Sequence, residues 1–333
     1  MSEELLIRKQ SLFLVAPAYN EEESVPRFVD EVDRALKASK LDARYRAELV
    51  LVDDGSTDAT YARLSALVEA RPRGAARSMA VLKLSRNFGH QSALHAGLEY
   101  AFQKSARGDF FVVLDSDLQH PPRLIAEIVR HLEAGIHHAQ MVRKDDPREG
   151  WFKRTSSGLF YRVFSFLGSV KLPRGGSDFR GFSHPFLEAY FKLPERERFN
   201  RGLFTWLGFS TLQIPYEPGA REAGVSKYST VKMLKLGLTG ITYFSSKPLL
   251  WTLAAITMLS VLFCGSYIAF EAVRYFHGHH YVLGWPTIVF FVCFWGGSLS
   301  FGQLLLGIYV SRIFEEVKGR PAYVIEETRN SVD

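Results

Sequence analysis

Two long stretches without a charged residue constrain the architecture of this chain more than any other feature. Leu249–Phe270 and Tyr281–Ser311 contain no Asp, Glu, Lys or Arg. About 20 apolar residues are enough for a helix to cross the hydrocarbon core of a bilayer. Two buried core helices are the alternative, but core helices are rarely uncharged over such lengths. We therefore expect two transmembrane helices, about 249–270 and 284–310, within residues 247–312.

Basic residues flank the predicted hairpin and indicate its orientation. The joining segment, Glu271–His280, is short, and its only firm positive charge is Arg274. The flanks are richer in basic residues, which are Lys227, Lys232, Lys235 and Lys247 before the hairpin and Arg312, Lys318 and Arg320 after it. The positive-inside rule places both flanks in the cytoplasm. We expect the N-terminal domain, residues 1–228, and a tail at 313–333 to be cytoplasmic.

Other features of the composition agree with a cytoplasmic domain. The apolar run Leu12–Ala16 that follows the charged N-terminus is too short for a signal peptide. Both cysteines, Cys264 and Cys293, lie in the apolar region, so a disulfide framework is excluded for the remainder. The net charge of +6 fits either an anionic partner or a solvated surface. A nucleic-acid partner is not expected, because the aromatic residues do not interleave with basic ones.

The segment before the first predicted span has a helical pattern of apolar residues. Val231, Leu234, Leu238 and Ile241 form one stripe, and the lysines lie off it. Such a helix either packs on the domain core or lies in the membrane interface. The adjacent span favours the second interpretation, and we predict an amphipathic juxtamembrane helix over residues 229–246.

The first 140 residues alternate between strand-like and helix-like segments. Short apolar runs suit buried strands of a mostly parallel sheet, and they are Leu12–Ala16, Leu49–Val52, Met79–Leu84 and Phe110–Leu114. Helical patterns lie between these runs, near residues 24–38, 58–70 and 90–104. This alternation predicts a doubly wound, Rossmann-like α/β domain, in which ligands bind at the carboxyl ends of the strands.

Two carboxylates follow the fourth predicted strand. Asp115 and Asp117 are separated by Ser116, and the amide of Gln119 lies close by in the sequence. Oxygen ligands of this kind suit Mg²⁺ or Mn²⁺, which usually bind substrate phosphates as well. An acidic loop that caps the next helix is the alternative. Because the motif follows a sheet strand, a metal–diphosphate site is a serious candidate.

Polar residues also follow the first two predicted strands. Asp53 and Asp54 come after Leu49–Val52, and Gly55 permits a tight turn there. Helix capping alone would account for Ser56 and its neighbours, but two carboxylates at a strand end could also accept hydrogen bonds from a base or a ribose. After the first strand, in the segment 17–22, Tyr19 could stack on a base and Glu21 could accept a hydrogen bond from it.

Five motifs in order resemble the family 2 glycosyltransferases of the GT-A fold. They are Pro17-Ala18-Tyr19-Asn20-Glu21-Glu22, Val52-Asp53-Asp54-Gly55-Ser56, Ser85-Arg86-Asn87-Phe88-Gly89-His90, Asp115-Ser116-Asp117-Leu118-Gln119-His120-Pro121 and Arg221-Glu222-Ala223-Gly224-Val225-Ser226-Lys227-Tyr228. The third and fifth narrow the resemblance to polyprenyl-phosphate glycosyltransferases, such as dolichol-phosphate mannose synthases and bacterial undecaprenyl-phosphate glucosyltransferases. Val225 departs from the family pattern, where Glu is common.

The resemblance implies roles for individual residues. The nucleotide-sugar would be bound by Pro17, Tyr19, Glu21, Val52, Asp54, Asp115 and Ser116. The metal, Mg²⁺ or Mn²⁺, would be bound by Asp115, Asp117 and Gln119. Phosphates of donor or acceptor would contact Arg143, Arg221 and Lys227. Asp117 and Asp178 are the predicted catalytic residues, and Asp178 would orient the sugar or the attacking phosphate. From its charges alone, the basic stretch Arg143–Arg154 is either a solvated surface or a site that binds the phosphate of a lipid acceptor.

The function implied is inverting transfer of a sugar from a nucleotide-sugar to a polyprenyl phosphate at the bacterial inner membrane. UDP-glucose and undecaprenyl phosphate are the first choices, and another sugar on the same lipid is the alternative. A processive polysaccharide synthase would need more spans and a Q-x-x-R-W segment, and the sequence has neither. A non-enzymatic nucleotide-binding membrane protein is the alternative of another class. A homo-oligomer is compatible with the sequence.

Overall fold

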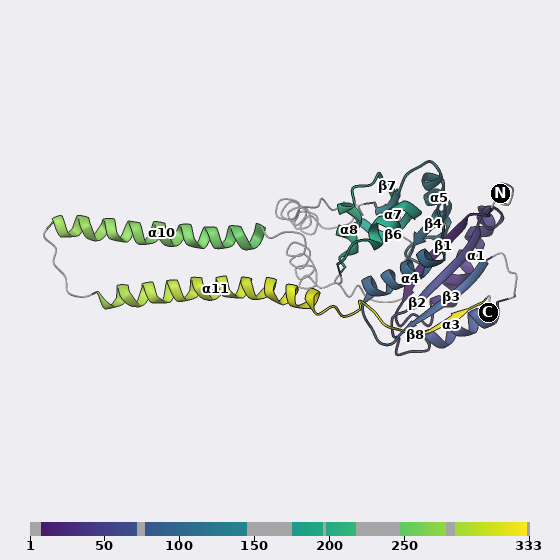
Figure 1. Ribbon diagram of the computed structural model, residues 1–333, viewed down its shortest axis with the longest axis horizontal. Coiled ribbons are helices and arrows are strands. Elements are labelled where there is room, and N and C mark those ends of the chain that lie inside the picture. The colour runs from purple at the N-terminus through teal and green to yellow at the C-terminus, as the bar shows by residue number, and fades with distance from the viewer. Residues whose placement is uncertain are drawn as a thin grey trace, which may run out of the picture. The chain divides into compact units, whose positions relative to one another are not determined.

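The computed structural model describes residues 8–71, 77–144, 175–195, 198–217, 247–277 and 284–331, and the chain forms two compact units. The first unit comprises Met1–Tyr161, Val170–Tyr228 and Pro321–Asp333. The second comprises Arg162–Ser169 and Ser229–Arg320. After the two long helices of the second unit, the chain returns to the first unit at Pro321 (Figure 1).

Within the described residues, a mixed sheet of eight strands forms the centre of the first unit, in the order β7-β5-β6-β4-β1-β2-β3-β8. The strands are β1 (Ser11–Ala18), β2 (Arg46–Asp53), β3 (Arg77–Leu84), β4 (Phe110–Val113), β5 (His138–Arg143), β6 (Gly176–Ser183), β7 (Thr211–Tyr216) and β8 (Ile325–Asn330). β4, β1, β2 and β3 run parallel, whereas β6 and β8 pair antiparallel with their neighbours. The predicted mostly parallel α/β fold is confirmed.

Helices cover both faces of the sheet. Their bounds are α1 (Val25–Ala38), α2 (Leu41–Arg44), α3 (Thr60–Glu69), α4 (His90–Lys104), η1 (Pro122–Leu124), α5 (Ile125–Glu133), α7 (His184–Phe191) and α8 (Asn200–Trp206). Alternate residues of a strand point to opposite faces, so Leu12 and Leu14 join the core beneath α1, α3 and α5. Phe13 faces the other layer, where it stacks on Phe111 with ring centroids 5.3 Å apart.

The absence of a side chain at Gly97 lets α4 lie close on the sheet. A Cβ at this position would come within 2.5 Å of Val15 Cγ1 and 2.8 Å of Val52 Cγ2. Any larger residue would push the helix outward. The close approach fixes the height of α4 above β1 and β2, and with it the position of His90, the first residue of the helix.

The strand β8 was not expected from the sequence, which indicated only a tail at 313–333. The structure pairs Ile325–Asn330 antiparallel with the edge strand β3. Polar side chains fasten it: the Tyr61 hydroxyl donates to Glu327 Oε2 at 2.6 Å, and Lys83 Nζ lies 3.0 Å from Glu326 Oε2. β8 therefore covers an edge that would otherwise be open.

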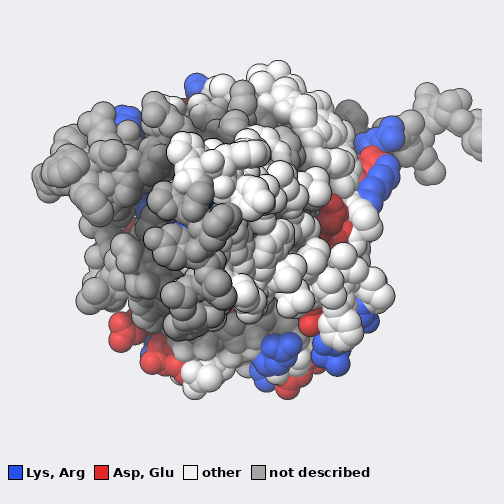
Figure 2. Space-filling view, turned by 90° about the vertical axis from the view of Figure 1, so that its left-hand side faces the viewer, with Lys and Arg blue, Asp and Glu red and all other residues white. Residues whose placement is uncertain are grey.

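The second unit contains two long helices, α10 (Lys247–Phe276) and α11 (Trp285–Val317), which pack together through rings such as those of Phe263 and Phe291. Both are long and apolar enough to cross a membrane: an 18-residue stretch reaches a mean hydropathy of 2.0 within Leu249–Phe276 and of 1.7 within Thr287–Val317. Figure 2 shows a broad surface free of Lys, Arg, Asp and Glu on the side it views. The predicted amphipathic helix at 229–246 lies outside the described residues.

Candidate active site

The motifs predicted from the sequence lie at the carboxyl edge of neighbouring strands. β2, β1 and β4 are adjacent, with Ala18 opposite Asp53 and Val15 opposite Val113. The polar segments that follow these strands therefore start from the same edge of the sheet. This is where α/β sheets bind their ligands.

Among the residues predicted to contact the base and ribose, Tyr19 has the most exposed side chain, at 44%. Pro17 and Val52 are buried. The Pro17 carbonyl accepts a hydrogen bond from the Ser116 hydroxyl at 3.0 Å, which ties the first motif to the fourth. The Glu21 carboxylate accepts from the Ser24 hydroxyl at 2.6 Å. Tyr19 is thus the member of this group that offers a ring to a ligand.

Asp54 is buried, and its carboxylate supports a turn. Oδ1 accepts the backbone N–H of Phe88 at 2.8 Å, and Oδ2 accepts that of Gly89 at 2.9 Å. Burial raises the pKa of Asp54, while these two hydrogen bonds oppose that shift. The carboxylate fixes the backbone just before His90. Asp54 therefore supports the turn that leads to His90.

The Asp115–His120 segment forms a tight turn after β4. Leu118 has a positive φ of 64°, and Asp117 Oδ1 accepts the backbone N–H of Gln119 at 3.0 Å. The Asp115 backbone N–H donates to His120 Nδ1 at 2.9 Å. These local bonds hold both carboxylates at the edge of the sheet. One oxygen, Asp115 Oδ1, is buried without a hydrogen bond among the described residues.

His120 is a neutral structural residue of this turn. Its ring stacks on Phe179 with centroids 5.2 Å apart, and burial lowers its pKa to about 4. Because Nδ1 accepts the Asp115 N–H, the ring proton is on Nε2. Its proximity to Asp115 Oδ2, at 3.4 Å, is therefore not an ion pair at neutral pH.

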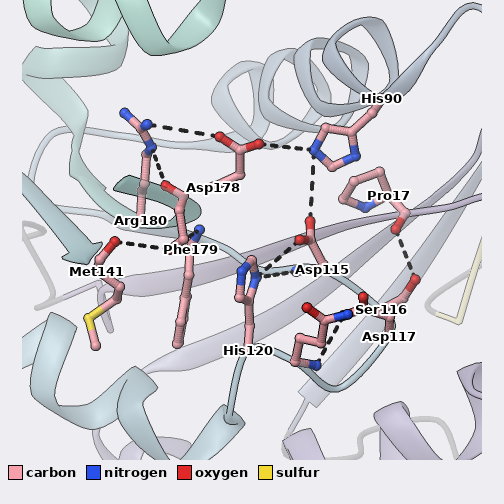
Figure 3. A network of polar contacts seen from close by, with 12 residues as sticks. Pro17, His90, Asp115, Ser116, Asp117, His120, Met141, Asp178, Phe179 and Arg180 are labelled. Carbon is pink, nitrogen blue, oxygen red and sulfur yellow. Dashed lines mark hydrogen bonds and ion pairs between the residues drawn. The ribbon is translucent and has the colours of Figure 1, made fainter. Parts of the chain in front are cut away.

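His90 lies between the carboxylates of Asp115 and Asp178 (Figure 3). Its Nε2 is 3.7 Å from Asp115 Oδ1 and 3.6 Å from Asp178 Oδ2. Burial by itself disfavours the charged imidazole, but the two carboxylates outweigh it and raise the pKa of His90 above its usual value of 6.5. The contacts join the turn after β4 with α4 and β6 in one polar network.

Asp178 is enclosed by cations. Arg201 Nε and Nη2 donate to its two oxygens, both at 3.0 Å. Arg180 is buried beneath it, with Nη2 3.9 Å from Oδ1. Although burial alone would raise the pKa of Asp178, the Arg201 charge and the neighbouring donors hold it well below the ordinary range. Asp178 is therefore ionised at neutral pH.

Arg143, at the end of β5, lies beside the predicted metal ligands. Its Nη2 donates to Gln119 Oε1 at 3.1 Å, and its Nε donates to the Tyr216 hydroxyl at 3.3 Å. The structure thus brings Arg143 to the Asp115–Gln119 turn. The other predicted phosphate contacts, Arg221 and Lys227, lie outside the described residues, as does most of the basic stretch after Arg143.

Oxygen donors suited to a divalent cation are present at this edge. Within the parts of the chain that the structure describes, no group of three His, Cys, Asp or Glu side chains could hold a metal ion by themselves. Among the contacts of the described residues, Asp115 Oδ1 is a buried oxygen without a hydrogen bond. The set fits an ion that takes its remaining ligands from phosphate oxygens and water, as Mg²⁺ commonly does.

Two residues of the network were not given a role from the sequence. His90 ends a motif that was recognised, but its position between two carboxylates depends on the start of α4. Arg201 carried no sequence signal, because its contact with Asp178 spans 23 positions and two elements. Together the contacts place the Asp115 and Asp178 carboxylates, His90 and the guanidinium of Arg201 in one polar network at this edge of the sheet.

Comparisons with known proteins identify the family of this chain. Residues 13–192 match the family described as glycosyl transferase family 2. The chain is 34% identical to the SfII prophage-derived bactoprenol glucosyl transferase of Shigella flexneri, over 95% of this chain and 97% of that one. It is 33% identical to a prophage bactoprenol glucosyl transferase homolog of Escherichia coli K12, over 95% and 98%.

A solved structure, mannosyl-3-phosphoglycerate synthase from Rubrobacter xylanophilus, aligns with a TM-score of 0.44 and 15% identity, covering 70% of this chain and 73% of that one. The family match extends over more than half of this chain, and the relatives align over nearly all of it. The chain is thus an enzyme that belongs to glycosyltransferase family 2.

Proposed function

We propose that this glycosyltransferase moves glucose from UDP-glucose to undecaprenyl phosphate at the cytoplasmic face of the bacterial inner membrane. The product would serve cell-envelope glycan or lipid modification. One observation carries the proposal: relatives named bactoprenol glucosyl transferases align over 95% of the chain. An alignment of that extent includes the two apolar helices as well as the sheet. An acceptor lipid that is embedded in a bilayer would explain why the chain has two membrane-spanning helices.

The chemistry suits the groups at the site. A phosphate monoester has a second pKa near ~6, so it is mostly dianionic at neutral pH and needs no strong base. One of its oxygens bonds to the anomeric carbon as the bond from that carbon to the donor diphosphate breaks, which inverts the configuration. UDP leaves with the electron pair. The enzyme must mainly bring two anions together and neutralise the departing charge.

Residues of the chain can supply this positioning. Tyr19 would stack on the base, with Pro17, Glu21, Val52 and Asp54 shaping that part of the site. The backbone turn that Asp54 supports would position His90, and the hydrogen bond to the Pro17 carbonyl would hold Ser116 in place. Arg143, which lies at the Asp115–Gln119 turn, would contact a phosphate together with Arg221 and Lys227.

The proposal includes Mg²⁺ or Mn²⁺ bound by Asp115 and Asp117. The buried Asp115 Oδ1 that lacks a hydrogen bond among the described residues fits such a ligand. Gln119 would join them once its Oε1 is released from Arg143. When bound, the ion supplies charge neutralisation for the leaving diphosphate.

A direct experiment tests the function. The full-length protein, purified in detergent, is incubated with undecaprenyl phosphate and each of a panel of sugar nucleotides in the presence of Mg²⁺ or Mn²⁺. The lipid product is identified by mass analysis. We expect a hexosyl-phosphate lipid from UDP-glucose. A product from GDP-mannose, UDP-N-acetylhexosamine or an aminoarabinose donor instead would reassign the sugar, and the absence of any lipid-linked sugar would overturn the proposal.

A further inference from the structure

The pairing of Asp178 with Arg201 suggests a different role for each residue. Arg201 donates through Nε and Nη2 to both oxygens of one carboxylate, at 3.0 Å each. Two parallel bonds of this kind fix the plane of the guanidinium as well as its position. Asp178 therefore determines where the Arg201 head group lies.

The two side chains differ in their access to solvent. The Asp178 side chain is 11% exposed, while that of Arg201 is 39% exposed. Asp178 also has the buried Arg180 3.9 Å from Oδ1 and His90 3.6 Å from Oδ2. A substrate that approaches from solvent meets Arg201 before it meets Asp178. The carboxylate, with both oxygens already accepting hydrogen bonds, is poorly placed to take a proton from a substrate.

Arg201 lies near the turn that would bind the diphosphate. His90 Nε2 joins Asp178 to Asp115 through contacts of 3.6 and 3.7 Å. Arg143 reaches the same turn through its 3.1 Å hydrogen bond to Gln119 Oε1. Two arginines from different elements, α8 and β5, therefore lie around the Asp115 turn. Both substrates of the proposed reaction carry phosphate, the chemical group that a fixed guanidinium recognises best.

We propose that Arg201 contacts a phosphate group of a substrate and that Asp178 is a positioning residue, which holds the Arg201 guanidinium in place. This inference rests on the proposed function for the identity of the substrates, whose phosphate is either the donor diphosphate or the lipid phosphate. It assigns no proton transfer to Asp178.

A double-mutant cycle tests the inference. The variants are Arg201→Gln, Asp178→Asn and the pair combined, each in the full-length protein. UDP with Mn²⁺ probes the donor site, farnesyl phosphate probes the acceptor site, and both dissociation constants are measured by calorimetry. Kinetic constants are measured with UDP-glucose and undecaprenyl phosphate. Arg198→Gln is the matched control, because Arg198 donates to the carbonyls of Tyr190 and Leu193 instead.

We expect Arg201→Gln to weaken binding of one probe by about 10- to 100-fold, as for the loss of a hydrogen bond to a charged group. The affected probe identifies which phosphate Arg201 contacts. Asp178→Asn should weaken the same probe, and the double variant should match Arg201→Gln within about twofold, because Asp178 would act only through Arg201. Arg198→Gln should change neither dissociation constant.

Two outcomes would overturn the inference. One is an unchanged affinity for both probes in Arg201→Gln. The other is an Asp178→Asn substitution that lowers kcat as strongly in the Arg201→Gln background as in the wild type, since Asp178 would then act independently. Failure of the proposed function is a separate result: the wild type would form no lipid product from UDP-glucose, while the effect of Arg201→Gln on phosphate binding would still be measurable.

Discussion

The turn after β2 offers a quantitative test of how closely the parts of the site are packed. Gly55 has a φ of +65°, and a Cβ built there would lie 2.6 Å from the backbone nitrogen of Asn87 and 2.7 Å from the Cα of Arg86. These are backbone atoms, which cannot rotate out of the way. The substitution Gly55→Ala must therefore displace the turn that leads to His90.

The magnitude follows from two contributions. A non-glycine residue in the left-handed region costs about 1–2 kcal/mol, and overpacking typically costs about 1–3 kcal/mol. Gly135→Ala is the matched control: its φ is +91°, and nothing lies within 4 Å of the added Cβ. The control should lose only the backbone contribution. Gly55→Ala should be less stable than Gly135→Ala by about 1–3 kcal/mol.

Thermal unfolding of the detergent-purified protein measures this difference. For a domain of 150–250 residues, each kcal/mol lowers Tm by about 2–4 °C. Gly55→Ala should also lose sugar transfer, because the displaced atoms precede Phe88 and Gly89, whose N–H groups bond to Asp54. If the two variants showed equal shifts in Tm and kept their activity, the backbone atoms of Arg86 and Asn87 would not restrict the size of the residue at position 55.

Three further predictions concern other parts of the chain. Asp117→Ala should abolish transfer while the protein stays folded, and chelation of divalent cations should abolish the activity of the wild type until Mg²⁺ or Mn²⁺ is restored. Near-normal turnover in metal-free Asp117→Ala would refute the metal assignment. Burial lowers the pKa of His138 well below 6.5, so the unfolded chain takes up a proton that the folded chain does not, and stability falls as pH drops below 6.5. His138→Phe should therefore reduce the pH dependence of the unfolding free energy between pH 6 and 5 by about 1 kcal/mol per pH unit, measured by denaturant titration. Tyr323→Phe, which removes a 2.6 Å hydrogen bond to Glu99, should destabilise the first unit by about 1–2 kcal/mol; an unchanged Tm would show that this bond contributes nothing.

The sequence predicted the elements whose signal is local. The four parallel strands are short apolar runs, because both of their faces are buried, and the predicted helices at 24–38, 58–70 and 90–104 match α1, α3 and α4 within a few residues. The apolar helices were equally clear from the absence of charge, although α11 continues to Val317, beyond the predicted end near 310.

Other elements and contacts depend on tertiary structure. β6 carries Ser177, Asp178 and Arg180, and burial of the arginine against Phe204 could not be expected from a polar segment. β8 is almost entirely polar, so no hydrophobic pattern marks it. The site motifs were found at their strand ends, but the Arg201–Asp178 pair requires α8 and β6 to be adjacent. Sequence spacing contains no information about that.

The position of β8 also affects the order in which the protein can be completed. During synthesis, β3 emerges well before the strand that pairs with its outer edge, because α10 and α11 lie between them in the sequence. The edge of β3 therefore stays without this partner until both apolar helices have been made. Completion of the sheet therefore has to wait for synthesis of those helices. Truncation of the chain before α10 would remove β8 and leave β3 as an open edge that is prone to aggregation. A version of this enzyme made without the apolar helices must keep residues 321–331, so that β8 can still pair with β3.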